Sequence, residues 1–376
     1  MTFGSAIDPM SDRYAHELGA LWTAARWGAA DPELVQAIAV RVSDGDGGAW
    51  VREWTASGGE AWASARRRPS ASAYLQAASF YAAAMALIED SDGLVDEPRL
   101  WERQRECWDR AVELVGGERL SLAYDQTTLP GYFFSAGTGE RPLVVIDHGG
   151  RVATSSAWAA AGAAAQARGY HWMTFDGPGR QAALRRQGLV LRPDWERVLT
   201  PVLDAMLARP GVDRERVAVI GIDHAGYGVP RGLAFERRFA AAVVAPGIVD
   251  ASRPWMEALP APARLALEDE DRESFDRELH LAGLFDPETD DRLRRLASEY
   301  DLSGTPLYDL SQRLRAFRLG QELGGIVAPM LVCPTGPEPS WAVQAADLCG
   351  RVPGAEQLAC DGPDEDGVWD WLDRFV

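Results

Sequence analysis

The chain has 376 residues, of which 47% are hydrophobic and 25% are charged, and this balance excludes an intrinsically disordered, collagen-like or transmembrane protein. Its 56 acidic and 38 basic residues give a formal net charge of −18, which argues against a nucleic acid or an anionic membrane surface as a partner. Every basic residue is an arginine, so Schiff-base catalysis, a P-loop lysine and a Ser–Lys dyad are excluded.

The segment up to about Gly117 has a helical, tryptophan-rich pattern. Apolar residues recur at three- and four-residue steps over 75–88 and again over 100–115, which predicts two long amphipathic helices. We expect residues 1–117 to form an N-terminal helical lid domain, which either docks as a plain helical domain or lines a substrate cavity with its aromatic side chains. Seven of the 14 tryptophans lie here: Trp22, Trp27, Trp50, Trp54, Trp62, Trp101 and Trp108.

From Glu118 onward, strand and helix patterns alternate. Residues 118–124 and 131–135 are expected to be strands around a turn at Leu129-Pro130-Gly131, and the apolar run at 143–146 predicts another strand. This alternation predicts a parallel sheet covered by helices on both faces. The elements expected next are a helix at about 155–168, a strand at 170–175, a helix at 194–208 and a strand at 217–220.

The alternation is interrupted between about 251 and 325. Charged helical segments such as 268–280 and 289–299 predict a helical cap inserted between late strands. We therefore expect a second domain at 118–376 that carries this cap insertion. After the cap, the patterns predict a strand at 330–333, a helix near 340–349, a strand near 356–360 and a last helix at 368–375.

The most informative stretch runs from Ile220 to Gly228, where a strand meets a helix. A sharp strand-to-helix turn of this kind needs small residues around its tip, because strand and helix must approach closely there. The turn also lifts the side chain at its tip above the sheet. Gly221 and Gly226 supply the small residues, and Asp223 is the tip.

Ordered motifs accompany this elbow between residues 176 and 231: 176–179 (Asp-Gly-Pro-Gly), 191–196 (Leu-Arg-Pro-Asp-Trp-Glu), 201–204 (Pro-Val-Leu-Asp), 226–227 (Gly-Tyr) and 230–231 (Pro-Arg). On these motifs the sequence resembles the α/β-hydrolase superfamily. Within it, the sequence resembles the branch that includes the fermentation-respiration switch protein, the fungal pigment polyketide-shortening hydrolases and dihydroxypseudooxynicotine hydrolase. The resemblance implies an α/β-hydrolase fold with a mostly parallel central sheet, an N-terminal helical lid domain and a helical cap insertion.

The catalytic positions depart from that family. Its members use a Ser at the tip, an acid after the penultimate strand and a His after the last strand. Here Asp223 replaces the Ser, the acid position falls at Glu338, and the His position falls at about Asp366, with no histidine after His280. The acidic turn at 364–366 is equally well explained as a solvated cap on the last helix.

Carboxylates gathered at the carboxyl edge of the sheet favour proton chemistry. Asp223, Glu338 and Asp366 cannot all be ionised cheaply beneath a water-excluding lid, so at least one pKa should rise toward neutrality. One acid could then protonate a carbonyl or a leaving hydroxyl while another carboxylate removes a proton. This arrangement suits dehydration, cyclisation, isomerisation or carbon–carbon cleavage of a small ketone-bearing or aromatic, polyketide-like metabolite.

Two other functions stay open at this stage. Asp223 could attack an ester, epoxide or halide, as the aspartate of epoxide hydrolases and haloalkane dehalogenases does, although those enzymes also need a His to activate water. Alternatively, the chain is a non-catalytic pseudo-hydrolase, a binding protein that kept the fold after losing the triad.

The resemblance also implies an oxyanion site. It corresponds to Gly149 and Gly150 after the first parallel strand and to the backbone N–H of His224 after the tip. His148 could orient a carbonyl or simply bond a neighbouring loop. Arg151 could reach the pocket or lie on the surface.

Neither the spacing of the histidines nor the resemblance indicates a cofactor or a metal, and we expect none. The four cysteines form no CxxC pair and the first twenty residues lack a leader pattern, so we expect a cytoplasmic protein with reduced thiols. The expected partner is a small-molecule substrate, with no nucleic acid and no membrane, and the resemblance implies a homodimer.

Overall fold

The computed structural model describes residues 9–376 except 43–45, 92–94, 151, 287–288, 290–292, 294–295, 298–304 and 336–338. Arg151 and Glu338, two of the expected site residues, therefore lie outside the described residues. No helix in the described ranges is both long and apolar enough to cross a bilayer.

The N-terminal part, residues 9–114, is a bundle of helices that we call the helical region. Trp50 and Trp54 are fully buried in it, and the Trp50 indole N–H donates to the carbonyl of Ala83 over 2.7 Å. The helices predicted over 75–88 and 100–115 are present as α4 and α5, although α4 ends at Ala86 and is buried nearly all round rather than amphipathic. The elements are α1 (Pro9–Arg26), α2 (Pro32–Arg41), α3 (Gly47–Arg67), α4 (Ala71–Ala86), η1 (Ile88–Ser91) and α5 (Glu97–Leu114).

A single eight-stranded sheet follows, in the order β1-β2-β4-β3-β5-β6-β7-β8. Strands β1, β2 and β4 pair antiparallel, and all pairings from β4 to β8 are parallel, so the mostly parallel sheet is confirmed. The strands are β1 (Glu118–Tyr124), β2 (Thr127–Phe134), β3 (Arg141–His148), β4 (His171–Phe175), β5 (Val212–Ile222), β6 (Ala241–Ala245), β7 (Met330–Val332) and β8 (Glu356–Gln357).

The turn between the first two strands was predicted at the wrong place. Leu129, Pro130 and Gly131 lie inside β2, where Pro130 pairs with Ser121 of β1. The chain instead turns at Asp125, which has a φ of 44°. Aspartate tolerates this left-handed conformation better than most residues, so a two-residue turn forms there and the proline is accommodated within the strand.

Helices cover both faces of the sheet. One core joins the face that carries Val144 and Trp172 to the helical region, and the other joins the face that carries Val145 and Val219 to α8 and the inserted helices. The first of these two cores contains buried side chains of both the helical region and the sheet in continuous contact, so the two parts share a core. The covering elements are η2 (Trp158–Gly162), α6 (Ala163–Ala167), α7 (Gln181–Gln187), α8 (Glu196–Leu207), α9 (Ala225–Leu233), α15 (Pro339–Arg351) and α16 (Asp366–Leu372).

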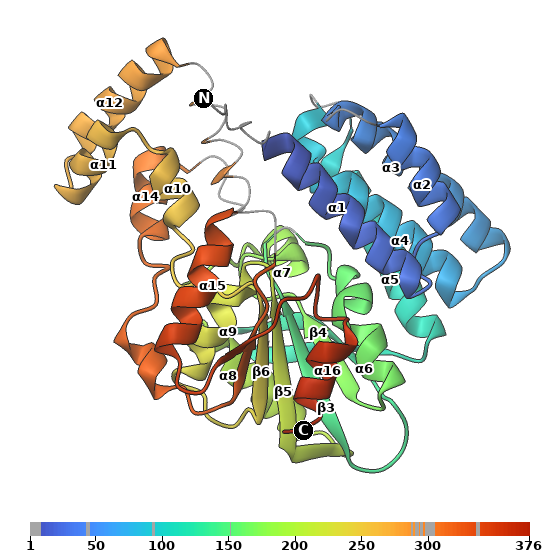
Figure 1. The fold of residues 1–376 in the computed structure, drawn as a ribbon. Coiled ribbons are helices and arrows are strands. Elements are labelled where there is room, and N and C mark those ends of the chain that lie inside the picture. Colours follow the sequence, from blue (N-terminus) through green and yellow to red (C-terminus); the bar gives the residue numbers. More distant parts are fainter. Residues whose placement is uncertain are drawn as a thin grey trace, which may run out of the picture.

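The inserted segment between β6 and β7 is helical, as predicted. Its first charged helix was expected to run unbroken over 268–280, but α11 ends at Glu268 and Asp271 caps a new helix by accepting from the Ser274 N–H over 3.0 Å. The expected helix at 289–299 lies mostly outside the described residues. Figure 1 shows the helical region and the inserted helices beyond the same end of the sheet. The inserted elements are α10 (Arg253–Ala258), α11 (Ala261–Glu268), α12 (Arg272–Phe285), α14 (Leu307–Leu314) and η3 (Gln321–Gly325).

Candidate active site

The sharp turn predicted between β5 and α9 is present. β5 ends at Ile222, α9 begins at Ala225, and Asp223 between them has a φ of 57°, which a residue with a side chain rarely adopts. A Cβ added to Gly226 would lie 1.9 Å from the carbonyl oxygen of Pro246. Position 226 therefore requires glycine, because helix and strand approach closely there. Asp223 lies at the tip of the turn between them.

The Asp223 carboxylate is ionised at neutral pH. Burial raises the pKa of this group, but the neighbouring rings of His224 and His16 outweigh that effect, so the pKa lies below its ordinary value. The Nδ1 atom of His224 is 3.4 Å from Oδ1 of Asp223, and the Asp223 side chain is 24% exposed. The carboxylate at the tip is therefore partly accessible to solvent and not fully buried.

The loop after β3 lies directly against the elbow. The Gly149 N–H donates to the carbonyl of Ile222 over 2.8 Å, and a Cβ added to Gly149 would be 2.3 Å from the backbone nitrogen of His224. At Gly150, where φ is 56°, a Cβ would be 2.8 Å from the Asp223 carboxylate. These glycines bring the loop, the His224 amide and the Asp223 carboxylate together, and the oxyanion site implied by the resemblance stays a prediction.

His148 ends β3 and is almost completely enclosed. Its side chain is 1% exposed, and neither ring nitrogen has a hydrogen-bond partner among the described residues. Its Nε2 lies 3.8 Å from Oδ1 of Asp176. Burial lowers the pKa of His148 to about 4, and Arg180 and Arg105 contribute in the same direction, so the imidazole is neutral at physiological pH.

Asp176 links this loop to the helical region. Its carboxylate accepts hydrogen bonds from the Arg105 guanidinium of α5 over 2.8 Å, from the Thr154 hydroxyl over 2.6 Å and from the Ala182 N–H over 3.2 Å. Asp176 and Arg105 are both buried. The sequence contains no local signal for Arg105, because its partner is 71 residues away.

The expected position of Asp366 in the site is wrong. Asp366 opens α16, its side chain is 94% exposed, and its carboxylate pairs with Arg168 over 3.0 Å. An acid in the first turn of a helix is favoured by the helix dipole and needs no further role there. The solvated-cap interpretation therefore holds for Asp366.

The closing segment buries a different carboxylate, that of Asp364. Its side chain is 4% exposed and accepts hydrogen bonds from the Arg26 guanidinium over 2.7 Å and the Trp27 indole N–H over 3.2 Å. Burial raises the pKa of Asp364, although Trp27 and Arg26 act against it. In this segment the pKa therefore rises at Asp364, which is hydrogen-bonded to residues at the end of α1.

Helix α1 also contributes titratable groups near Asp223. The side chains of His16 and Glu17 both interact electrostatically with the Asp223 carboxylate. Sequence reasoning missed both residues, because nothing in the pattern of α1 indicates which part of the sheet it approaches.

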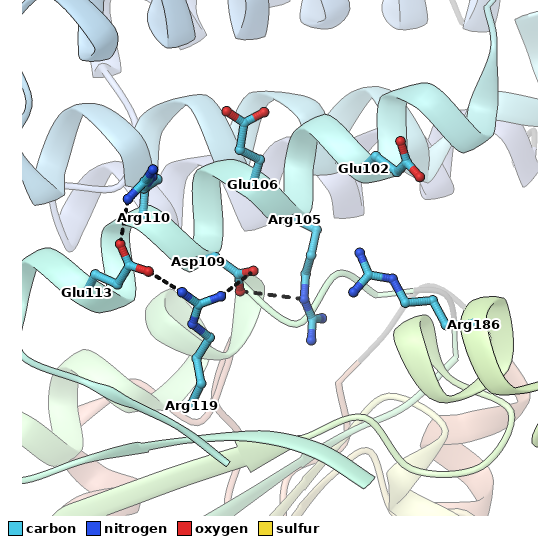
Figure 2. A pocket seen from close by; sticks show the side chains of 8 residues that line it. All are labelled: Glu102, Arg105, Glu106, Asp109, Arg110, Glu113, Arg119 and Arg186. Carbon is cyan, nitrogen blue, oxygen red and sulfur yellow. Dashed lines mark hydrogen bonds and ion pairs between the residues drawn. The ribbon is translucent and has the colours of Figure 1, made fainter. Parts of the chain in front are cut away.

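A separate groove of about 470 Å³ lies along α5, where the helix faces Arg119 of β1 and Arg186 of α7. Figure 2 shows Arg105 and Arg186 pointing into it, with a chain of ion pairs from Arg105 through Asp109 to Arg119. No elbow or glycine-loop residue lines this groove, and its walls are charged, so it does not resemble the enclosed, mostly apolar site of a small ligand. It is lined by Glu102, Arg105, Glu106, Asp109, Arg110, Glu113, Arg119 and Arg186.

Within the described ranges, no group of three or more His, Cys, Asp or Glu side chains is arranged to hold a metal ion.

The chain has the α/β-hydrolase fold. The crystal structure of 2,6-dihydroxy-pseudo-oxynicotine hydrolase matches it with a TM-score of 0.66 at 18% identity, covering 94% of this chain and 95% of the other. The structure of wild-type AbyA5 matches with a TM-score of 0.59 at 20% identity, covering 88% and 83%. At such identities the likeness concerns the fold alone.

In sequence, the chain is related to fungal proteins named hydrolases and hydrolyases. It is 32% identical over 259 residues to the hydrolase acrC of Aspergillus aculeatus, and 30% identical over 250 residues to the hydrolyase poxO of Penicillium oxalicum. The chain spans about three fifths of the length of these curated relatives. No protein-family model matches it.

Proposed function

We propose that the chain is an enzyme that acts on a small ketone-bearing or aromatic, polyketide-like metabolite by carboxylate acid–base chemistry. The reaction classes that fit are dehydration, cyclisation, isomerisation and carbon–carbon cleavage, as a tailoring step in biosynthesis or catabolism. The single observation that carries the proposal is the elbow itself, whose tip is the Asp223 carboxylate with a lowered pKa and whose contacts with the neighbouring loop require glycine.

The geometry suggests how such a site works. A carbonyl oxygen of the substrate would accept a hydrogen bond from the loop at Gly150, because the Gly149 N–H already donates to the Ile222 carbonyl, and it would compete with the Asp223 carboxylate for the His224 amide. These bonds would stabilise the negative charge that develops when a neighbouring C–H bond breaks. Asp223, ionised and partly exposed, would take that proton. His148 is neutral and lacks a hydrogen-bond partner in the described part of the chain, so it can bond a substrate oxygen.

The names of the relatives support a reaction of this kind. A hydrolyase adds or removes water, which is chemistry that a base and an acid on opposite sides of a carbon–oxygen bond perform. Other relatives are named hydrolases, which fits the alternative in which Asp223 is a nucleophile. That route needs a base for the attacking water, and the described closing segment, 339–376, contains no histidine.

The test compares the metabolites of a deletion strain with those of strains complemented by the wild type or by Asp223→Asn. The wild type should consume the accumulated metabolite, and Asp223→Asn should be slower by about 10²–10⁴-fold, the usual contribution of a general base. Undiminished turnover by Asp223→Asn would refute the role of the carboxylate. The absence of any accumulated metabolite would favour the non-catalytic alternative.

Two further measurements separate the remaining alternatives. An alkyl adduct on the intact protein, detected by mass spectrometry, would show that Asp223 acts as a nucleophile. Serine-directed fluorophosphonates should leave the elbow unlabelled. The homodimer and the lid and core domains, 1–117 and 118–376, stay predictions, and light scattering would check the former.

A further inference from the structure

Helix α5 has polar groups on one of its buried faces. Trp101, Gln104 and Arg105 are three and four residues apart, so they share one face of the helix. All three side chains are buried. A buried polar group costs free energy unless it is hydrogen-bonded, so apolar side chains would pack this face equally well. These polar groups therefore need an explanation beyond packing.

Gln104 and Arg105 bind the loop that follows β3. The Nε2 atom of Gln104 donates to the Ser155 hydroxyl over 2.6 Å, and the Arg105 guanidinium donates to the Thr154 hydroxyl over 2.9 Å. The Thr154 hydroxyl donates in turn to the Asp176 carboxylate over 2.6 Å. Thr154, Ser155 and Asp176 are all buried. These contacts fix the end of the loop to α5.

Trp101 holds the same loop through Gln181. The Trp101 indole N–H donates to the side-chain oxygen of Gln181 over 2.7 Å, and the Nε2 atom of Gln181 donates to the Val152 carbonyl over 2.9 Å. Gln181 has a φ of 35°, which a residue with a side chain rarely adopts. Such a backbone conformation persists only where the surrounding structure holds it, and it is common at functional sites. The bridge from α5 to the loop is therefore built at a conformational cost.

The beginning of this loop faces the elbow. The Gly149 N–H donates to the Ile222 carbonyl over 2.8 Å, and a Cβ added to Gly150 would lie 2.8 Å from the Asp223 carboxylate. Gly150 and Val152 are two residues apart, and each residue has only two freely rotating backbone bonds. A displacement of the end of the loop is therefore passed on to the glycines beside Asp223.

We propose that α5 positions the loop after β3 for the reaction at Asp223, with Trp101 and Gln104 as its positioning residues. This inference rests on the proposed function. Displacing a reacting group by about 1 Å can lower a rate by about 10²-fold. The contacts that fix the loop should therefore affect kcat more than KM, and the helical region takes part in the reaction as well as covering the sheet.

The paired variant Gln104→Leu/Ser155→Ala separates positioning from packing. It replaces both partners of one buried hydrogen bond by apolar groups of similar shape, which costs little stability. It also leaves the ion pair between Arg105 and Asp176 intact, so α5 stays docked. We expect the urea midpoint to stay near the wild-type value. With the metabolite that accumulates in the deletion strain, kcat should fall about tenfold and KM should change less than about twofold.

Removing the second contact as well should enlarge the loss. Trp101→Phe keeps an aromatic ring at this position of α5 but removes the N–H that binds Gln181. Added to the paired variant, it should bring the loss in kcat to about 10²-fold. A kcat no lower than that of the paired variant would overturn the role of Trp101.

Hydrogen exchange at the Gly149 amide tests the loop without a substrate. In the paired variant this amide should exchange about tenfold faster, the factor that corresponds to one lost hydrogen bond. Gln166→Leu is the matched control, because it removes a glutamine hydrogen bond to the Ser135 carbonyl at the opposite end of the strands, where β2 ends beside the start of β4. It should leave exchange and turnover unchanged.

Three results would overturn the positioning role of Gln104. The first is a wild-type kcat in the folded paired variant, and the second is a loss of activity that lies in KM alone. The third is a lower kcat with unchanged exchange at Gly149 or with a large loss of stability, since either would mean that the loop is not the route of the effect.

The outcomes distinguish this inference from the proposed function. Slow turnover by Asp223→Asn together with normal turnover by the paired variant would overturn the role of α5 and leave the proposed function intact. If no metabolite accumulates in the deletion strain, both fall together.

Discussion

The elbow that carries Asp223 and the closing segment that carries Asp366 both follow strands of one sheet, yet only the elbow lies where the sequence pattern predicts. At the elbow, three glycines stand in contacts that no larger residue fits: Gly149, Gly221 and Gly226. In the closing segment, the backbone makes no comparable demand, and Asp366 points into solvent while Asp364 is buried. A turn that only glycines allow can be located from the sequence, because the glycines themselves mark it. Which side chain of a loop is buried depends on partners that are distant in the sequence.

The largest effect should come from breaking the elbow itself. Gly226→Ala places a Cβ against the Pro246 carbonyl, so strand and helix must move apart, and we expect a loss of about 3 kcal/mol or more in the free energy of unfolding. Gly350→Ala is the matched control, because Gly350 lies in α15 with nothing within 4 Å of an added Cβ. Urea denaturation measures both. Equal stability of the two variants would mean that the elbow is not held by this contact.

The next largest effect is a pH dependence of the free energy of unfolding, which arises from His148 beside the elbow. In the unfolded chain His148 takes up a proton near its ordinary pKa of about 6.5, and in the folded chain only near 4. Stability from this group is therefore complete above pH 6.5 and falls as pH drops toward 4, by on the order of 3 kcal/mol. Urea titrations at several pH values should show a weaker decline for His148→Asn. Parallel curves for the two proteins would contradict the buried, neutral imidazole.

The smallest effects concern the closing segment and sharpen its contrast with the elbow. Asp364→Asn loses charge-assisted bonds to Arg26 and Trp27, and we expect about 1–2 kcal/mol of destabilisation. Asp366→Asn removes an exposed ion pair and should change stability by less than about 0.5 kcal/mol. Thermal unfolding of both variants checks the ranking. The reverse ranking would mean that Asp366, not Asp364, is the structural carboxylate.

The parts of the fold that were predictable are those with a short-range signal. Apolar runs predicted β3 and β5, helical periodicity predicted α4 and α5, and the small residues around Asp223 predicted the elbow. The turn before β2 was misplaced because a proline looks like a turn residue even where a strand accommodates it. Such errors arise when two local preferences compete.

The parts of the site that were missed depend on contacts between segments far apart in the chain. Arg105 bonds a carboxylate 71 residues away, and Asp364 bonds Arg26 across 338 residues. Glu17 approaches Asp223 only because α1 is packed on the bundle in one orientation. No spacing within a single segment encodes such juxtapositions, so they need the three-dimensional arrangement.

The buried pair between Arg105 and Asp176 limits how the protein can admit a substrate. If the helical region swung away as a rigid flap, it would break this pair and also expose the apolar core that the helical region shares with the sheet, at about 25 cal/mol for each Å² of apolar surface uncovered. Small molecules should therefore enter and leave through local movements of side chains and loops. Helix α5 should stay packed on the sheet while they do so.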